Sequence, residues 1–158
     1  MENLFGEIYN WFQSLFGQDL SYYLWGYDPI TGAYTNSNLY NFIGLITVFI
    51  SLITVLLYYY VFSHPKYSKW WTWLLTLLVN GGVALFIGYG IVYSKYINGF
   101  IPEELLCQRD PDGTVTYLIN DLNCWGFGIA NIFVAIILFF VLTFVFKWWS
   151  RDAKHVPF

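Results

Sequence analysis

The residues that could do chemistry in this chain are few, and they stand inside long apolar runs. Asn80 and Asn131 are the strongest hydrogen-bonding side chains of two of these runs, and hydroxyl side chains occur at Thr47, Ser51 and Thr54. The three hydroxyl residues are spaced i, i+4 and i+7, so they share roughly one face of a helix. In a bilayer, such groups bond a neighbouring helix or line a narrow polar path. We therefore interpret Thr47, Ser51 and Thr54 as pore-lining candidates.

The same runs contain no carboxylate, amine, guanidinium or imidazole side chain that could act as a catalytic acid or base. None of them includes Asp, Glu, Lys, Arg or His. Proton relays and ion-coupled transport use ionisable groups inside the membrane, and hydrolysis needs an activated nucleophile or paired carboxylates. The Asp110–Gly113 stretch faintly resembles a calcium loop, but the remaining ligand positions do not follow and a turn explains it better. The sequence predicts a protein that is not an enzyme and has no cofactor or metal.

The two cysteines predict a different kind of chemistry. Cys107 and Cys124 are the only cysteines, and both fall in the connection of residues 94–124. The Pro-Asp-Gly between them is a turn signal, and the following Thr-Val-Thr-Tyr favours a strand. We expect a short hairpin closed by a Cys107–Cys124 disulfide, which would stabilise a loop of about 17 residues by about 3 kcal/mol. The alternative is two free thiols.

Small residues predict where helices approach each other closely. Gly81, Ala84 and Gly88 are spaced i, i+3 and i+7, and Gly126 and Ala130 match the small-xxx-small pattern. In lipid, small residues let two helix backbones come together, and an asparagine beside them can hydrogen-bond across the contact. We interpret this set, with Asn80 and Asn131, as helix-packing or oligomer residues. The contact lies either within one subunit or between subunits.

The elements that must position these residues are membrane-spanning helices. The chain has 158 residues, of which 58% are hydrophobic and 11% are charged, whereas a soluble domain has about 25% charged residues. An apolar run of about 20 residues is long enough to cross a bilayer as a helix. The sequence thus predicts an all-α integral membrane protein with three spans, at residues 42–62, 70–93 and 125–146.

The segment before the first span has a different pattern. Within residues 1–27, apolar side chains recur at helical spacing, with polar side chains on the other face. This pattern predicts an amphipathic helix lying in the membrane interface, outside the cytoplasm, followed by a loop at residues 28–41. Its polar face has no Lys or Arg, so anionic lipid cannot hold it. Either apolar burial in lipid holds the helix, or it packs on the protein's own outer cap.

The basic residues predict how the chain is threaded. With three spans, the connection 63–69 and the tail 147–158 lie on one side, and the N-terminal segment and the 94–124 connection lie on the other. Short loops rich in Lys and Arg stay in the cytoplasm. The first side has five such residues and the second has Lys95 and Arg109, so we expect a cytoplasmic (inner) membrane protein with its N-terminus outside and its C-terminus inside. The five topology-setting residues are Lys66, Lys69, Lys147, Arg151 and Lys154.

This organisation resembles that of phage holins of the three-span type. The resemblance lies in the three spans, the outside N-terminus and the basic tail, and no motif contributes to it. It implies a homo-oligomer that acts as a pore-like membrane effector. The alternative is a structural or adaptor subunit that docks in a larger membrane complex. Membrane lipid is an expected partner in both cases, and the net charge of −3 argues against nucleic acid.

Overall fold

Three long helices form the body of the protein. The computed structural model describes residues 4–61 and 70–147, and within them three helices are long and apolar enough to cross a membrane. The protein is therefore a mostly helical membrane protein, as the sequence predicts. The three helices are α4 (Leu39–Leu56, continued by the π-helical turn η1, Leu57–Val61), α5 (Trp70–Ile97) and α7 (Asp121–Lys147).

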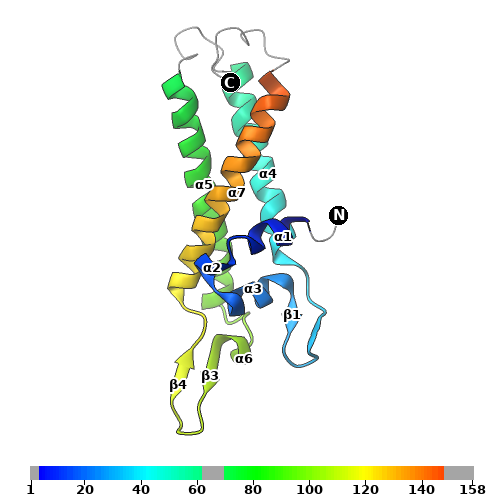
Figure 1. Ribbon diagram of the computed structural model, residues 1–158, viewed down its shortest axis with the longest axis vertical. Helices are drawn as coiled ribbons and strands as arrows, with labels where there is room; N and C mark the ends of the chain where they lie inside the picture. The colour runs from blue at the N-terminus through cyan, green and yellow to red at the C-terminus, as the bar shows by residue number, and fades with distance from the viewer. Residues whose placement is uncertain (1–3, 62–69, 148–158) are drawn as a thin grey trace.

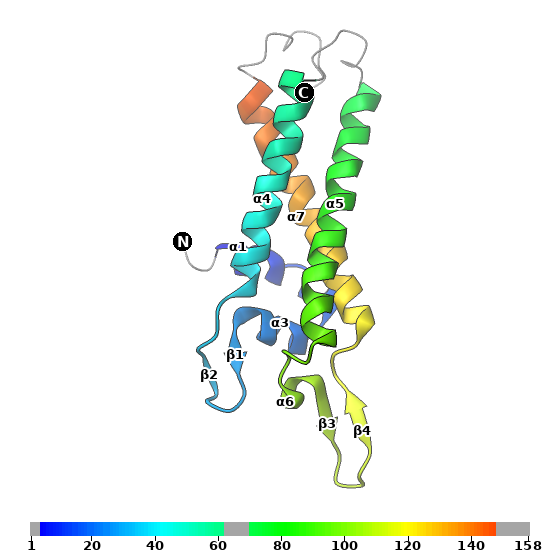
Figure 2. The ribbon, with the colours of Figure 1, turned by 180° about the vertical axis from the view of Figure 1, so that it is seen from behind.

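Helix α7 packs against both of the other long helices. Its most extensive contact is with α5 and its second is with α4, while α4 and α5 touch each other much less. Two opposite views show the three helices running side by side, with both β-hairpins beyond one end of the bundle (Figures 1 and 2). The helices are longer than the apolar runs. As a result, Lys95 belongs to α5 and Cys124 to α7.

The N-terminal segment is not the single helix that its periodicity predicts. A turn at Trp11 and Phe12 interrupts it, and Gly17 interrupts it again with a φ of 88°, a value that side-chain-bearing residues rarely adopt. At the first of these breaks, the hydrogen bond from Phe12 N to Tyr9 O measures 2.9 Å. The segment consists of α1 (Leu4–Asn10), α2 (Gln13–Phe16) and α3 (Gln18–Trp25).

These short helices lie against the bundle. Figure 1 shows α1 and α2 crossing the long helices at an angle, and α1 contacts α4 while α2 contacts α7. Four of their side chains, Tyr9, Phe16, Leu20 and Leu24, are fully buried in the main core with Phe127 of α7. Burial against the protein, rather than in lipid alone, therefore positions the segment. Trp11 is 75% exposed on its outer side.

Two β-hairpins project beyond the bundle. In the first, β1 (Tyr27–Asp28) pairs with β2 (Ala33–Tyr34), and the Asp28 carboxylate accepts hydrogen bonds from Ile30 N and Thr31 Oγ1. The second hairpin follows the short helix α6 and forms at the Pro-Asp-Gly turn, where Gly113 has a φ of 79°. Its elements are α6 (Glu103–Leu106), β3 (Cys107–Arg109) and β4 (Val115–Tyr117).

The predicted Cys107–Cys124 disulfide is absent from the structure, because both cysteines are free. The hairpin register pairs Cys107 with Tyr117, so backbone hydrogen bonds close this loop well before the chain reaches Cys124. Cys124 is buried in the first turns of α7, inside the main core. Its thiol thus serves as a small apolar side chain, a common role for buried free cysteine.

A second core lies toward the other end of the bundle. Tyr58, Tyr59 and Tyr60 follow one another at the end of the first span. Within the π-helical turn, Tyr58 and Tyr59 are both buried, whereas Tyr60 is exposed. Tyr58 and Tyr59 join Trp73 and Phe139 in this core.

Candidate functional site: a polar network inside the bundle

Asn131 is the centre of a hydrogen-bond network that joins four helices. Its side chain is fully buried on α7. Its Oδ1 atom accepts from the Tyr9 hydroxyl of α1 at 2.5 Å and from the Thr47 hydroxyl of α4 at 3.0 Å. Its Nδ2 atom donates to the carbonyl oxygen of Ala84 on α5 at 2.7 Å. A single amide therefore fixes the relative positions of α1, α4, α5 and α7.

The two hydroxyl groups differ in how firmly they bind Asn131. Burial raises the pKa of the Tyr9 hydroxyl well above its ordinary value, so Tyr9 stays protonated and acts as the donor. Thr47 has one hydroxyl hydrogen and shares it between Asn131 Oδ1 and the carbonyl oxygen of Ile43, which lies 2.9 Å away. Tyr9 is thus the stronger anchor of the Asn131 carbonyl.

Asn80 forms a second, less complete polar contact. Its Nδ2 atom donates to Ser51 Oγ of α4 at 3.1 Å and to the carbonyl oxygen of Ala135 on α7 at 3.3 Å. Its Oδ1 atom is buried with no hydrogen-bond partner in the part of the chain that the structure describes. Asn80 therefore links α5 to both other spans through its amide nitrogen, while the hydrogen-bonding capacity of its amide oxygen is unused.

We expect Asn80→Leu to lower the free energy of unfolding by only about 1 kcal/mol. The substitution removes two interhelical hydrogen bonds, which are weak in membranes at about 0.6 kcal/mol each, and it also removes an acceptor that is already unpaired. The measurement is denaturant unfolding in mild detergent. Val79→Leu, at an exposed position on the same helix, is the control and should be neutral. A loss above about 3 kcal/mol for Asn80→Leu would contradict this description.

The small residues predicted for packing lie at the helix contacts of one subunit. A Cβ added at Gly88 would come within 3.0 Å of the Asn131 side chain, and one at Gly81 within 3.3 Å of Ile132. A Cβ at Gly126 would overlap the backbone carbonyl of Leu15 in α2. Ala84 and Ala130 are also buried between helices. The predicted contact is thus present within the subunit, and a contact between subunits stays a prediction.

The other predicted residues are not gathered at this site. Thr54 is partly buried and its hydroxyl donates to Ile50 O of its own helix, whereas Thr47 and Ser51 face the interior of the bundle. Lys147 ends α7, at the far end of the bundle from the hairpins. Lys66, Lys69, Arg151 and Lys154 lie outside the described residues.

Sequence reasoning missed Tyr9 and Tyr40. Tyr40 is fully buried at the start of α4, donates to Ser21 Oγ of α3 at 2.9 Å and stacks on Tyr9 with ring centroids 5.3 Å apart. The chain has 14 tyrosines. Residue type alone does not separate these two, which are buried in the core, from those expected at the membrane interface. The available signal for Tyr9 was its place on a predicted helix whose polar face has no Lys or Arg to bind anionic lipid.

The network has the properties of a structural device. It joins amides, hydroxyls and backbone carbonyls, and it contains no ionisable group that could exchange a proton near neutral pH. Its geometry can fix helices and the N-terminal segment in one arrangement. Comparison of the chain with protein-family models, with curated proteins and with solved structures gives no match.

Proposed function

We propose that this protein is a non-enzymatic, multi-pass docking subunit of a larger membrane complex. Its spans provide a fixed anchor, and its hairpins provide the contact surface. One observation carries the proposal: both hairpins expose large apolar side chains beyond the ends of the spans. Ile30 is 85% exposed and Tyr34 is exposed in the first hairpin, and Val115 and Tyr117 are exposed in the second.

Exposed side chains of this kind favour contact with another protein. Exposed aromatic and aliphatic residues that gather outside the membrane mark interaction surfaces, and tyrosine is enriched in them. Each hairpin has only two strands, so each also offers unpaired backbone N–H and C=O groups along its outer edges. A partner strand could pair with these groups by β-augmentation.

The burial of the hydroxyl side chains inside the bundle favours a docking function over conduction of ions or solutes. Thr47 and Ser51 are 1% and 0% exposed, respectively, so a path between copies of the chain would not be lined by them in this arrangement. The outer faces of the spans present apolar side chains suited to lipid. On α4 these are Phe42, Leu45, Phe49 and Ile53, and on α7 they include Phe133, Ile137 and Val141.

A pore-like homo-oligomer is the second candidate, and one feature of α5 favours it. Gly82 and Gly90 have no heavy atom within 4 Å of an added Cβ, so a helix from a second copy could approach the α5 backbone there. In either case we propose the cytoplasmic membrane, with the hairpins outside. The excess of Lys and Arg in the 63–69 and 147–158 segments supports this orientation.

Site-specific photo-crosslinking in intact cells tests the docking proposal. A benzophenone-bearing amino acid is placed at the position of Tyr117 or Ile30, and at the lipid-facing position of Phe49 as the control. We expect a covalent adduct from the two hairpin positions that contains a different protein, and no adduct from Phe49.

Adducts of twice the chain's mass, together with dye release from liposomes by the purified protein, would support the pore-like homo-oligomer instead. The absence of any adduct from both hairpin positions would contradict docking through the hairpins.

A further inference from the structure

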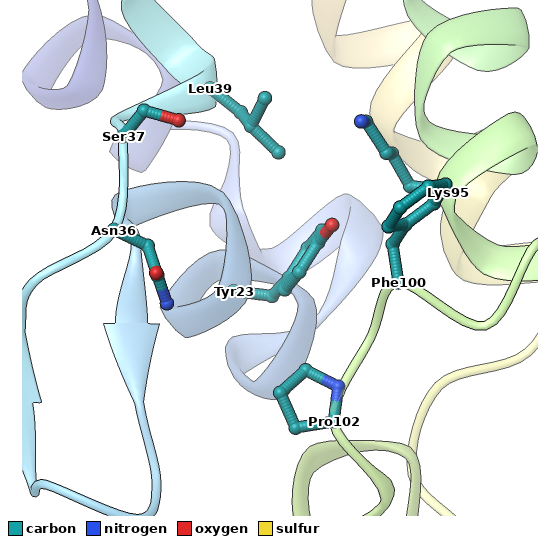
Figure 3. A pocket seen from close by; sticks show the side chains of 7 residues that line it. All are labelled: Tyr23, Asn36, Ser37, Leu39, Lys95, Phe100 and Pro102. Atoms are coloured by element: carbon teal, nitrogen blue, oxygen red, sulfur yellow. The ribbon is translucent and has the colours of Figure 1, made fainter.

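A pocket of about 200 Å³ lies where the hairpin region meets the bundle. It is open to the outside and is bordered by the end of α3, the segment leading into α4 and the end of α5 (Figure 3). The figure shows Tyr23 and Lys95 extending into the space between these elements, with Phe100 beside Lys95. Asn36 and Ser37 complete the polar part of the lining.

The positive charge of Lys95 is not neutralised by the protein. No carboxylate lines the pocket, and among residues 4–61 and 70–147 the one ion pair is Arg109 with Glu103. Lys95 Nζ instead lies 4.4 Å from the centre of the Phe100 ring, a cation–π contact that orients the ammonium without cancelling its charge. The pocket therefore attracts an anion.

The remaining polar groups of the lining add hydrogen-bond donors to the pocket, with Asn36 and Ser37 on the side opposite Lys95. Within the described chain, the side chains of Tyr23, Asn36 and Ser37 form no hydrogen bond with the protein. Burial raises the pKa of the Tyr23 hydroxyl, so it is protonated at neutral pH and able to donate. A phosphate group, which has several strong acceptor oxygens, matches a pocket into which an ammonium and a tyrosine hydroxyl both extend.

We propose that this pocket binds the phosphate group of an anionic phospholipid. The apolar part of the lining, formed by Leu39, Phe100 and Pro102, suits a lipid better than a free phosphate ion. The pocket also lies beside the first residue of α4 and the last turn of α5, at the end of two spans, where headgroups are found. The proposal is independent of any docking through the hairpins.

Lipid retention by the full-length protein tests the assignment. The protein is delipidated in mild detergent, phosphatidylglycerol or phosphatidylcholine is added back, and native mass spectrometry measures the bound lipid. We expect wild-type protein to retain phosphatidylglycerol in preference to phosphatidylcholine. Lys95→Gln should retain phosphatidylglycerol about tenfold more weakly, because one charge-assisted contact is lost. Lys95→Arg, which keeps the charge, should stay close to wild type.

Arg109→Gln is the matched control, because it removes the same charge from an exposed, ion-paired residue of the second hairpin. It should retain the lipid like wild type. Equal retention by wild type and Lys95→Gln would overturn the proposal. Inorganic phosphate forms a separate arm of the experiment. If it displaced the lipid or raised the melting temperature as effectively as phosphatidylglycerol does, the lipid assignment would also be overturned.

Discussion

Gly126→Ala should lower the free energy of unfolding by about 2–3 kcal/mol and loosen the N-terminal helices from the bundle. A Cβ at this position would overlap the carbonyl oxygen of Leu15 and would lie 3.1 Å from the Cα of Phe16. These are backbone atoms of α2, so no side-chain rotation can make room, and overpacking of this kind costs about 1–3 kcal/mol. Denaturant unfolding in mild detergent measures the loss.

The matched control is Gly82→Ala on α5, where an added methyl group meets no atom within 4 Å. It should leave stability unchanged or raise it by a few tenths of a kcal/mol, since alanine favours a helix more than glycine does. Limited proteolysis of residues 4–25 should become faster in Gly126→Ala and not in Gly82→Ala. If the two variants behaved alike, α2 would not pack on α7 as described.

Asn131→Leu is expected to have the largest effect among the polar substitutions, at about 3 kcal/mol. The change removes the acceptor for Tyr9 and Thr47 and the donor to Ala84 O. It also leaves the buried Tyr9 hydroxyl without its partner, and an unsatisfied buried donor costs about 1–3 kcal/mol. Unfolding under the conditions used for Asn80→Leu allows a direct comparison of the two asparagines.

A double-mutant cycle with Tyr9→Phe isolates the contact that anchors α1. Phenylalanine keeps the stacking of residue 9 on Tyr40 and removes only the hydroxyl, so the coupling energy with Asn131→Leu reports the Tyr9–Asn131 hydrogen bond. We expect a coupling of about 1 kcal/mol. A coupling near zero would mean that the hydroxyl does not bind Asn131 in the membrane-like environment.

The spans were predictable because their signal is local. An apolar run without charges needs no knowledge of its partners, and small residues beside an asparagine indicate close packing wherever the helix is placed. For that reason, Asn131, Gly88 and Gly126 could be singled out before their contacts were known. Their partners could not be predicted, because Tyr9 and Asn131 are 122 positions apart in the sequence.

The incorrect expectations concerned geometry that depends on a few backbone angles. The N-terminal periodicity predicts one helix, but Gly17 at a φ of 88° turns the chain so that α3 can pack separately. The cysteine spacing predicts a disulfide, but the hairpin register sets the partner of Cys107 at Tyr117. Residue composition did not indicate either outcome.

The position of α7 between α4 and α5 has a consequence for biogenesis. When the first two spans leave the ribosome, the partners on α7 for Tyr9, Thr47 and Asn80 have not yet emerged from it. The nascent chain therefore lacks the α7 partners of these groups until α7 inserts, and Thr47 and Asn80 have only their bonds to Ile43 O and Ser51 Oγ. Insertion of α7 supplies these partners, and a chain truncated before α7 should be a substrate for membrane quality-control proteases.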